Sequence, residues 1–475
     1  MSNGNKNGVE PTILVVFGAT GDLAQRKLYP ALFDLFVKGL LPKKFAIRAM
    51  GRRKLDEVSY RAFIREIIGR ERKEINTGQL AVFVEAISYT QGLFEDERAY
   101  GRLGEALMKT DEKFNVCSNK LFYLAVPPNL YETILHRLSK SGLTIPCGNG
   151  EGWTRILIEK PFGKDTETAR RLDRLLGKLF QETQIFRIDH YLAKETIQNI
   201  LTFRFANALF EPIWNAKHIE RIEIRMFEKD TVGARGSLYE GLGALRDVGQ
   251  NHLLAMLSLV TMEYPRGYSA QSIRKERSRA LKELVPVTGA ALRKIIKGQY
   301  EGYKAGEGVN PDSTTETFFS LNAYMNSKRW KGVPIELSGG KALSENKTEI
   351  NIYFKDVNCG AGDITSNRNV LTFRIQPNEG ISILFWIKKP GFVHETNPQV
   401  LSFNYADVPL TAVMPDAYER VLLDSIRGDQ TLFASTEETE AAWKFITPIL
   451  ERWGNNPLKI YARGSSLEQI LKNGK

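Results

Sequence analysis

Short apolar runs alternate with amphipathic stretches along the chain as far as residue 188. Continuous apolar runs rich in β-branched residues are typical of strands that are buried on both faces. Amphipathic helices are predicted over 23–37, where Gly39 ends the first, and over 130–138. Strand–helix–strand order requires right-handed crossovers, so this part is predicted to be a doubly wound, Rossmann-like parallel α/β sheet. The predicted strands are 13–17, 45–50, 80–85, 120–126 and 155–159.

The pattern changes after residue 188, where longer helices and alternating apolar and polar positions take over. Alternation puts one face of each strand against a core, which predicts a mostly antiparallel sheet backed by helices, an α+β arrangement. We therefore divide the chain into a disordered terminus at 1–10, a first domain at 11–188 and a second domain at 189–475. The predicted helices are 194–208, 242–260 and 436–453, and the predicted strands are 219–226, 317–325, 349–354, 369–375 and 382–387.

Composition excludes several classes of protein. Of the 475 residues, 42% are hydrophobic and 25% are charged, as in ordinary globular domains. No apolar run reaches the ~18 residues that a transmembrane helix needs, and the first ten residues lack the apolar core of a signal peptide. Cys117, Cys147 and Cys359 show no metal-binding spacing, which favours unpaired thiols in a reducing compartment. These features predict a cytoplasmic protein without a bound metal.

The chain is basic, with 66 Lys and Arg against 55 Asp and Glu, a net charge of +11. Such an excess indicates an anionic partner, which could be nucleic acid, an acidic membrane or a phosphorylated small molecule. The most basic stretch is 271–305, where Glu276 and Glu283 interrupt the cations. This interruption favours a solvated helix face over a nucleic-acid patch, so we predict neither a nucleic-acid nor a membrane partner.

A glycine-containing turn connects the first predicted strand to the first predicted helix, the context that a dinucleotide-binding fingerprint requires. The first glycine allows the sharp turn, the second admits a pyrophosphate close to the backbone, and the small last residue lets helix and strand pack. The pyrophosphate would lie at the helix N-terminus. A glycine-rich turn without a ligand is the alternative. The residues are Gly18, Ala19, Thr20, Gly21, Asp22, Leu23 and Ala24.

Arg52 follows the second predicted strand, where NAD-selective sites usually place an acid for the ribose 2′-hydroxyl. A guanidinium at this point favours the 2′-phosphate of NADP, because its planar fork matches phosphate oxygens. The alternative is a surface cluster of basic residues, since Arg53 and Lys54 come next.

Polar residues that are able to bind a ligand or take part in catalysis lie at two further strand ends. Lys160 directly follows the strand 155–159, and the carboxyl ends of strands are where open α/β sheets bind ligands. In the segment that follows Arg187, His190 and Lys194 would share one face if a helix begins near residue 190, and Asp189 and Tyr191 lie beside them in the sequence. This group would suit a sugar phosphate, although an N-cap aspartate with solvated neighbours explains the spacing equally well.

His252 ends a dense polar run that begins at Arg246. Histidine titrates near neutral pH and can take a proton in catalysis. A carboxylate such as Asp189 would fix its tautomer and stabilise the imidazolium. A purely structural histidine at a helix edge is the alternative.

Four motifs in this order, GATGDLA, EKPFG, RIDHYLAKE and RDVGQNHLL, together resemble the glucose-6-phosphate dehydrogenase family. RFANALFEPIWN, GKALSENK and MPDAYER are also similar to that family, so the resemblance extends from about residue 11 to 455. The chain departs from the family at Ala193, usually glycine, and at Asn346, usually cationic, where Lys347 is a potential substitute. It also stops without the longer tail of animal members, which puts a second, structural NADP site in doubt.

The resemblance implies oxidation of C1 of glucose 6-phosphate to 6-phosphogluconolactone with hydride transfer to NADP, the first step of the pentose phosphate pathway. It makes 11–188 the NADP-binding domain and 189–475 the catalytic and dimerisation domain, and it implies a homodimer or homotetramer. The implied catalytic residues are the general base His252, its orienting partner Asp189, and Lys160. The implied substrate contacts are Lys160, His190, Tyr191, Lys194, Glu228, Asp247, Lys341 and Lys347, and the implied cofactor contacts are Gly18 to Ala24, Arg52, Tyr131 and Lys160.

Two other functions remain open at this point. A related NAD(P)-dependent sugar oxidoreductase with a different substrate would share most of these residues. A catalytically inactive NADP-sensing protein would keep the nucleotide-binding residues but would not need the set formed by Asp189, His252 and Lys160.

Overall fold

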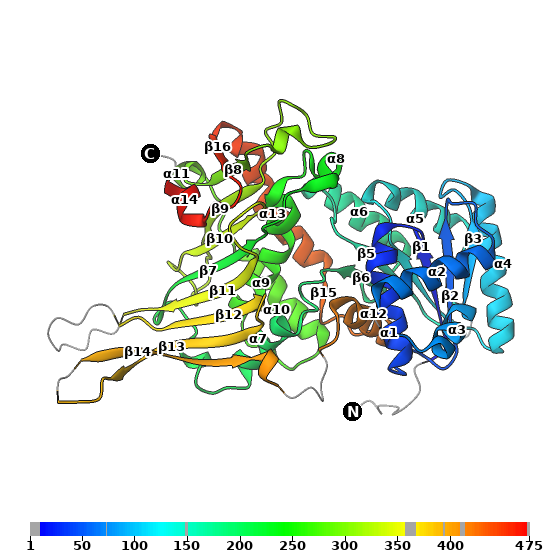
Figure 1. Ribbon diagram of the computed structural model, residues 1–475, viewed down its shortest axis with the longest axis horizontal. Helices are drawn as coiled ribbons and strands as arrows, with labels where there is room; N and C mark the ends of the chain where they lie inside the picture. The colour runs from blue at the N-terminus through cyan, green and yellow to red at the C-terminus, as the bar shows by residue number, and fades with distance from the viewer. Residues whose placement is uncertain are drawn as a thin grey trace.

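The structure is a computed structural model that describes residues 10–72, 74–147, 151–356, 367–392, 395–408 and 414–472. Two sheets lie side by side with a layer of helices between them (Figure 1). The expectations for residues 1–9 and for Cys359 fall outside the described residues. Among the residues described, no helix combines the length and the apolar character needed to cross a membrane.

The first sheet has the strand order β15-β6-β5-β4-β1-β2-β3. All neighbours are parallel except β15, which pairs antiparallel with β6. Without β15 the order is 3-2-1-4-5-6, the doubly wound arrangement that binds dinucleotides at the reversal between β1 and β4. The predicted Rossmann-like fold is therefore confirmed. The strands are β1 (Thr12–Phe17), β2 (Phe45–Gly51), β3 (Ile87–Gln91), β4 (Asn119–Leu124), β5 (Thr154–Glu159), β6 (Ile185–Ile188) and β15 (Phe433–Ala434).

Both faces of the first sheet are covered by helices, which explains its continuous apolar strands. Leu14 and Val16 of β1 belong to one core, whereas Ile13 and Val15 belong to the core on the opposite face. All four are fully buried, because alternate residues of a strand point to opposite faces. The covering helices are the π-helix η1 (Ala24–Leu28), α1 (Tyr29–Val37), α2 (Glu57–Glu71), α3 (Thr77–Glu85), α4 (Glu97–Phe114), α5 (Tyr131–Lys140) and α6 (Thr166–Leu179).

The strand predicted at 80–85 is wrong, because this segment forms helix α3. The Asn76 side chain caps the helix by accepting a hydrogen bond from the Gln79 amide (3.1 Å). Phe83 and Val84 alone are buried, and Phe83 packs against the Phe33 ring of α1. A short apolar run does not distinguish a strand from a helix, and the actual strand β3 begins just afterwards at Ile87.

The second sheet has the order β14-β13-β12-β11-β7-β10-β9-β8-β16. Its neighbours are antiparallel except for the β7–β10 and β8–β16 pairs, so the mostly antiparallel prediction is confirmed. The strands are β7 (Ile219–Phe227), β8 (Ile296–Tyr300), β9 (Phe318–Ala323), β10 (Ile335–Gly340), β11 (Lys347–Phe354), β12 (Val370–Gln376), β13 (Gly380–Lys388), β14 (Thr396–Asn404) and β16 (Leu458–Tyr461).

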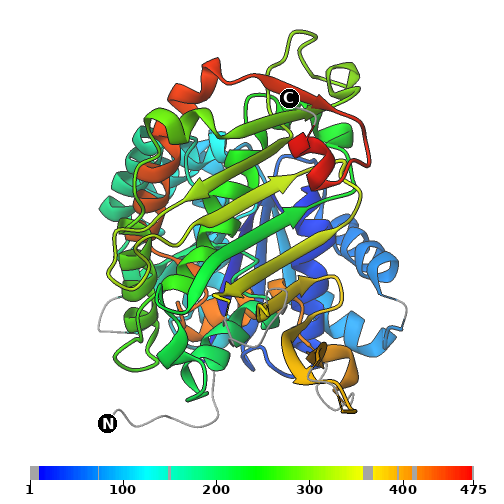
Figure 2. The ribbon, with the colours of Figure 1, turned by 90° about the vertical axis from the view of Figure 1, so that its left-hand side faces the viewer.

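Helices cover the face of the second sheet that is turned toward the first, and Figure 2 shows the other, largely uncovered face. The C-terminal part of the chain returns to the first sheet, where it supplies β15 and places α12 against α1. The division at 188/189 stays a prediction. The helices are α7 (Glu195–Phe205), α8 (Gly236–Tyr239), the π-helix η6 (Leu245–Leu253), α9 (Leu254–Thr261), α10 (Ala270–Lys282), α11 (Gly289–Arg293), α12 (Ala417–Arg427), α13 (Thr436–Arg452) and α14 (Leu467–Lys472).

The basic stretch 271–305 is not simply a solvated helix face. Arg274 and Arg277 of α10 are buried, and Arg277 pairs with Glu438 of α13 at 2.7 Å. The Arg277 guanidinium also donates to the carbonyls of Thr431 and Phe433, both at 2.8 Å. These cations therefore join α10 to the segment that carries β15.

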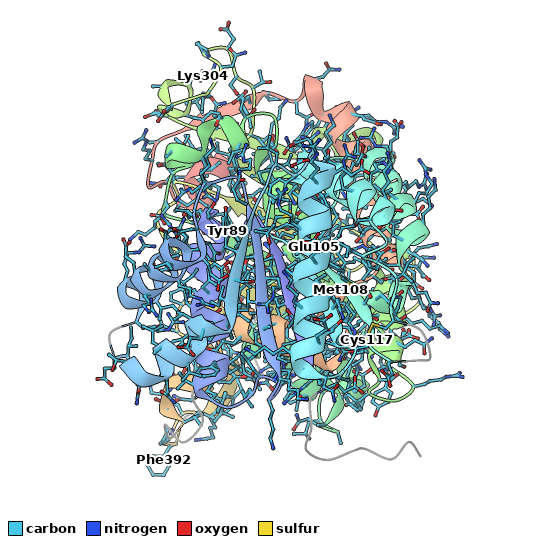
Figure 3. All side chains as sticks on the ribbon, turned by 90° about the vertical axis from the view of Figure 1, so that its right-hand side faces the viewer. Tyr89, Glu105, Met108, Cys117, Lys304 and Phe392 are labelled. Atoms are coloured by element: carbon cyan, nitrogen blue, oxygen red, sulfur yellow. A yellow bond between two sulfur atoms is a disulfide. The ribbon has the colours of Figure 1, made fainter. Side chains whose placement is uncertain are left out.

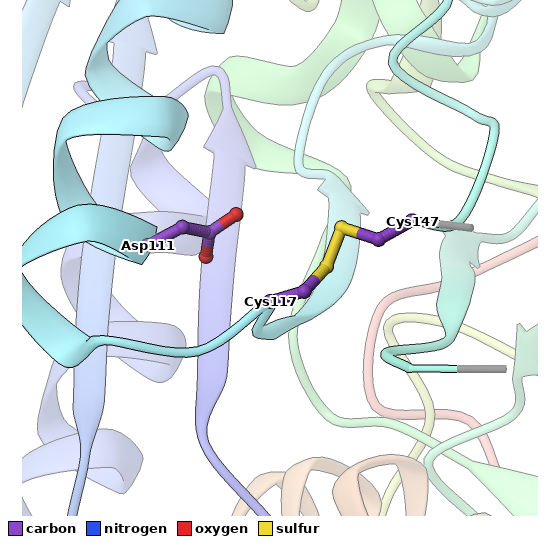
Figure 4. Close-up of side chains that lie close together, drawn as sticks. All are labelled: Asp111, Cys117 and Cys147. Atoms are coloured by element: carbon purple, nitrogen blue, oxygen red, sulfur yellow. A yellow bond between two sulfur atoms is a disulfide. The ribbon is translucent and has the colours of Figure 1, made fainter. Parts of the chain in front are cut away.

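The expectation of unpaired thiols is wrong for Cys117 and Cys147, which form a disulfide (Figure 4). Cys117 lies near the end of α4 (Figure 3), just before β4, and Cys147 lies in the segment before β5. Because β4 and β5 are neighbours, their leading segments meet, and the two Cα atoms are 6.3 Å apart. The 30-residue separation along the chain carries no sign of this contact.

Candidate active site

The turn after β1 lies at the reversal of strand order in the first sheet. Gly18 has a φ of +80°, and a Cβ atom there would lie 2.2 Å from the carbonyl oxygen of Ala125, which follows β4. Only glycine fits both the backbone conformation and this close approach. The Gly21 amide donates to the Gly18 carbonyl (2.8 Å), which closes the turn before the helix begins. This tight turn lies at the position where doubly wound sheets hold a dinucleotide.

The remaining residues of this turn divide into buried and exposed positions. Ala19 and Ala24 are fully buried and pack the turn onto the sheet, whereas Asp22 is exposed and pairs with Arg26 at 2.8 Å. Thr20 and Leu23 are half-buried. The turn therefore presents its backbone, more than its side chains, to a ligand at the helix N-terminus.

Arg52 lies at the carboxyl end of β2, beside the turn that follows β1, and its side chain is exposed. Its backbone is held by the Gln91 amide, which donates to the Arg52 carbonyl (3.4 Å). The Tyr89 hydroxyl likewise donates to the carbonyl of Arg53 (2.8 Å). Tyr131 of α5 is buried, and its hydroxyl donates to the Glu159 carbonyl (2.8 Å), so it supports the segment that leads to Lys160.

His252 of η6 and Asp189 form a buried pair at the junction of the two sheets. The Nδ1 atom of His252 lies 2.6 Å from Oδ1 of Asp189, although the residues are 63 positions apart. Asp189 directly follows β6, and its Oδ1 also accepts the Tyr191 amide hydrogen bond (3.0 Å). The hydrogen-bonded imidazole and carboxylate predicted from the sequence are therefore in contact.

Burial and charge set the protonation of this pair. Burial alone would raise the pKa of Asp189, but His252 and its hydrogen bond hold that pKa below its usual value. Burial lowers the pKa of His252 below its ordinary value, with Lys160 adding to this effect and Asp189 opposing it. Because an ionised carboxylate can only accept a hydrogen bond, Nδ1 of His252 carries the proton and Nε2 carries the lone pair. Nε2 is thus able to accept a proton near neutral pH.

Lys160 directly follows β5, and its side chain reaches the same pair. The peptide bond from Lys160 to Pro161 is cis. The Lys160 ammonium lies 2.9 Å from Nε2 of His252 and 3.0 Å from the carbonyl oxygen of Asp247. The Asp247 carboxylate is 3.4 Å from the Lys160 ammonium and 3.7 Å from that of Lys341. Burial acts to raise the pKa of Asp247, but these two cations lower it to about 2.

Further cations and donors surround this centre. Lys341, just after β10, pairs with Glu228 at 2.5 Å. The Lys194 ammonium donates to the Gln376 side chain (2.7 Å), which donates in turn to the Tyr191 hydroxyl (3.0 Å). The rings of His190 and Tyr191 lie 4.8 and 4.3 Å from that of His252. The structure therefore brings together, from five separate segments, every predicted substrate contact except one.

Lys347 is the exception, because no described contact joins it to this group. Its ammonium lies 2.8 Å from Glu345 and 4.0 Å from Glu349. The neighbouring Asn346 side chain accepts the backbone hydrogen bond of Lys229 (2.7 Å). A substrate-binding role of Lys347 stays a prediction.

Three residues of this region were not singled out from the sequence. Gln376, next to the end of β12, links Lys194 to Tyr191. Glu159, one position before Lys160, accepts a hydrogen bond from the buried Tyr123 hydroxyl (2.6 Å), and burial raises its pKa to about 7. Tyr418 stacks on His190 with ring centroids 6.2 Å apart. Glu159 and Tyr418 had a signal, since they lie within the EKPFG and MPDAYER motifs, whereas Gln376 had none.

Comparisons with known proteins cover both parts of the chain. Residues 15–199 match the family "Glucose-6-phosphate dehydrogenase, NAD binding domain", and residues 201–472 match "Glucose-6-phosphate dehydrogenase, C-terminal domain". Glucose-6-phosphate 1-dehydrogenase of Treponema pallidum is 40% identical, covering 96% of this chain and 92% of the relative. The enzyme of the same name from Chlamydia muridarum is 38% identical, covering 93% of this chain and 90% of the relative.

Solved structures agree with this result. A glucose-6-phosphate dehydrogenase in complex with its substrate glucose-6-phosphate superposes with a TM-score of 0.89 at 33% identity, over 98% of this chain and 97% of the other. Glucose-6-phosphate 1-dehydrogenase from Mycobacterium avium superposes with a TM-score of 0.83 at 30% identity, covering 96% and 95%. The chain belongs to the glucose-6-phosphate dehydrogenase family and is an NADP-dependent oxidoreductase of carbohydrate metabolism.

Proposed function

We propose that His252, oriented by Asp189, takes the proton of the C1 hydroxyl of glucose 6-phosphate while hydride leaves C1. The buried 2.6 Å contact between His252 and Asp189 carries this proposal. Loss of hydride leaves positive charge on C1, and removal of the hydroxyl proton relieves it, giving the lactone carbonyl. NADP supplies the hydride acceptor when bound.

Lys160 and Asp247 act on the same reacting group. The Lys160 ammonium occupies the position next to Nε2 of His252, so the C1 hydroxyl replaces it as a partner of Nε2 when the substrate binds. The ammonium keeps its second partner, Asp247, and is then free to donate to a sugar oxygen. Asp247 and Glu228 offer carboxylate acceptors for the sugar hydroxyls, and Lys341 holds both of them.

The phosphate of the substrate is assigned to His190, Tyr191 and Lys194. Lys194 and the Tyr191 hydroxyl are bridged by the neutral Gln376 side chain, so the described contacts give Lys194 no carboxylate partner. A phosphate can replace Gln376 there with charge-assisted hydrogen bonds. The pKa of His190 is held below its ordinary value by burial and by His252, so this ring is a neutral donor.

The residues present fit NADP. Gly18 lets the turn after β1 pack closely against Ala125, where any Cβ would collide, and the turn leads into a helix N-terminus that can hold a pyrophosphate. Arg52 would hold the 2′-phosphate at the end of β2, where an NAD-selective site would have an acid.

Arg52→Ala tests the 2′-phosphate assignment. The variant should weaken NADP binding by about tenfold or more and leave NAD binding nearly unchanged, because only NADP carries the phosphate. Isothermal titration with the two nucleotides measures both effects, with Lys54→Ala as the control for general loss of positive charge. Equal losses for the two nucleotides would refute the assignment.

The function itself is tested by turnover. Purified protein with NADP and glucose 6-phosphate should produce reduced nicotinamide, while glucose without the phosphate should react far more slowly. His252→Asn should lower kcat by about 10²–10⁴-fold, the usual contribution of a general base. His218→Asn, at a histidine outside the active site, is the control. Near-normal kcat in His252→Asn would remove this residue from the role.

We also propose that the uncovered face of the second sheet joins two copies of the chain. Alternate residues of β7 place Arg221, Glu223 and Arg225 on this face, where both arginines pair with Glu223 at 3.2 and 2.7 Å. Charges paired within one copy leave a nearly neutral surface that a second copy can cover. Light scattering of the purified protein should give twice or four times the 53.7 kDa of the chain, and a monomer would contradict the proposal.

A further inference from the structure

A cavity lies beside the first residues of helix η6, between β8, the segment before β9 and the end of α13. Its volume is about 470 Å³, within the range of small-molecule sites. We call it the Lys297 cavity. It shares no residue with the active site described above, and its walls include Arg246, Lys297, Thr314, Glu316, Trp453 and Asn456.

Two cations with spare donors face the Lys297 cavity. Lys297 is only 7% exposed, and its ammonium donates to the Gly454 carbonyl (3.2 Å), its single hydrogen-bond acceptor among the described residues, and lies 6.0 Å from the centre of the Trp453 ring. An ammonium has three protons, so two remain for a ligand. Arg246 donates through Nε to Lys164 and through Nη1 to Gly241 and Leu242, which leaves Nη2 without an acceptor in the described part of the chain.

A buried acid balances only part of this charge. Glu316 is 6% exposed and accepts the backbone hydrogen bond of Leu245 (3.1 Å), the first residue of η6. Two cations against one carboxylate leave the cavity net positive. A buried ammonium without a strong partner is costly, so an anionic ligand would stabilise this arrangement.

We propose that the Lys297 cavity is a second small-molecule site that binds a phosphate monoester. The phosphate group accepts hydrogen bonds from Lys297 and Arg246, and the carbon skeleton lies against Trp453. A hydroxyl of the ligand donates to Glu316. The volume of the cavity admits a phosphorylated molecule of three to six carbons.

The position of the site couples it to catalysis. Glu316 holds the first turn of η6, the helix that carries Asp247 and His252. Arg246 holds the Lys164 carbonyl, four residues beyond Lys160. A ligand that pulls on Arg246 and Glu316 therefore acts on both segments that position the base, and such coupling between sites is reciprocal.

Titration calorimetry with glycerol 3-phosphate tests the binding site. Lys297→Met should weaken binding by about tenfold or more, because it removes a charged hydrogen bond while keeping the apolar stem. The exposed Lys294→Met is the matched control and should bind as the wild type does. Lys194→Met, in the proposed phosphate grip of the active site, should also retain binding. Loss of binding in Lys194→Met but not in Lys297→Met would place the probe in the active site and overturn the proposal.

Two substitutions of one exposed residue test the site independently if Lys297→Met fails to fold. Thr314 is exposed at the cavity wall, so Thr314→Glu should fold and repel the phosphate, whereas Thr314→Gln, of equal size but neutral, should bind normally. Equal affinities of these two variants, or no heat of binding in the wild type, would refute the site. Because heat is measured without turnover, this result is independent of the proposed reaction.

The coupling has its own readout. Glycerol 3-phosphate should change kcat at saturating glucose 6-phosphate in the wild type and in Lys294→Met, but not in Lys297→Met. Competition in the active site would alter KM alone, so an unchanged kcat would overturn the coupling.

Discussion

At the scale of single residues, the active site depends on pKa values that burial and neighbouring charges set. His252 stays neutral near pH 7 because burial lowers its pKa. Burial acts to raise the pKa of Asp189, but His252, its hydrogen bond and the neighbouring His190 and Lys160 together lower that pKa further, so Asp189 stays ionised. The pair therefore holds one proton on Nδ1 and one lone pair on Nε2, the state that the proposed role as general base requires. This protonation state requires that the pKa values of His252 and Asp189 are both lowered.

The pH dependence of kcat/KM follows from this pair. Activity should fall as the pH drops through the pKa of His252, which lies below the ordinary value of 6.5. Asp189→Asn removes the charge that raises this pKa, so the acid limb should move to still lower pH, and kcat should fall by about 10²–10⁴-fold. A rate profile of both proteins measures the shift. A limb that moves to higher pH in Asp189→Asn would contradict the assignment.

Glu159 makes folding stability depend on pH. Burial raises its pKa from 4.5 to about 7, so the folded state favours the protonated form. Protonated Glu159 contributes fully to the free energy of unfolding below pH 4.5. This contribution is lost as the pH rises toward 7, and it is about 3 kcal/mol at most. Glu159→Gln should therefore raise the Tm at pH 8 more than at pH 5. Thermal unfolding at both pH values checks this, and equal shifts would contradict it.

At the scale of elements, the ends of strands and helices supply the site. Lys160 follows β5, Asp189 follows β6, Lys341 follows β10, and His252 lies on η6. The carboxyl ends of the parallel strands meet at one edge, so residues far apart in the chain converge there.

Helix α10 provides a test of how the elements are joined. Arg277→Met should lower the free energy of unfolding by about 3–5 kcal/mol, because it leaves the buried Glu438 and two carbonyls without their partner. Arg279→Met, at an exposed arginine of the same helix, should change it by less than about 0.5 kcal/mol. Urea unfolding compares the two, and similar losses would show that burial of Arg277 is not responsible.

At the scale of the whole molecule, the C-terminal part of the chain ties the two sheets together. The Phe433 ring of β15 packs on Phe186 of β6 with centroids 4.8 Å apart, and the Trp443 indole of α13 donates to the Phe162 carbonyl (2.8 Å). Lys38, directly after α1, pairs with Glu419 of α12. The two parts consequently share buried contacts.

This sharing predicts a single unfolding transition. Far-ultraviolet circular dichroism, tryptophan fluorescence and loss of activity should follow the same curve in urea, because the largest core cluster contains residues of both parts. Two separated transitions would contradict the prediction.

The sequence by itself determined the Rossmann-like start and the mostly antiparallel second sheet, and its motifs contain most of the residues that the structure brings together around His252. Continuous apolar runs reveal buried strands, and the glycine of a tight turn is required by its backbone, so both are visible in local patterns. The tertiary structure alone decided that 80–85 is a helix, that Cys117 meets Cys147, that α10 buries Arg274 and Arg277, and that Lys347 pairs with Glu345. Those outcomes depend on which distant segments become neighbours, and no local pattern records that information.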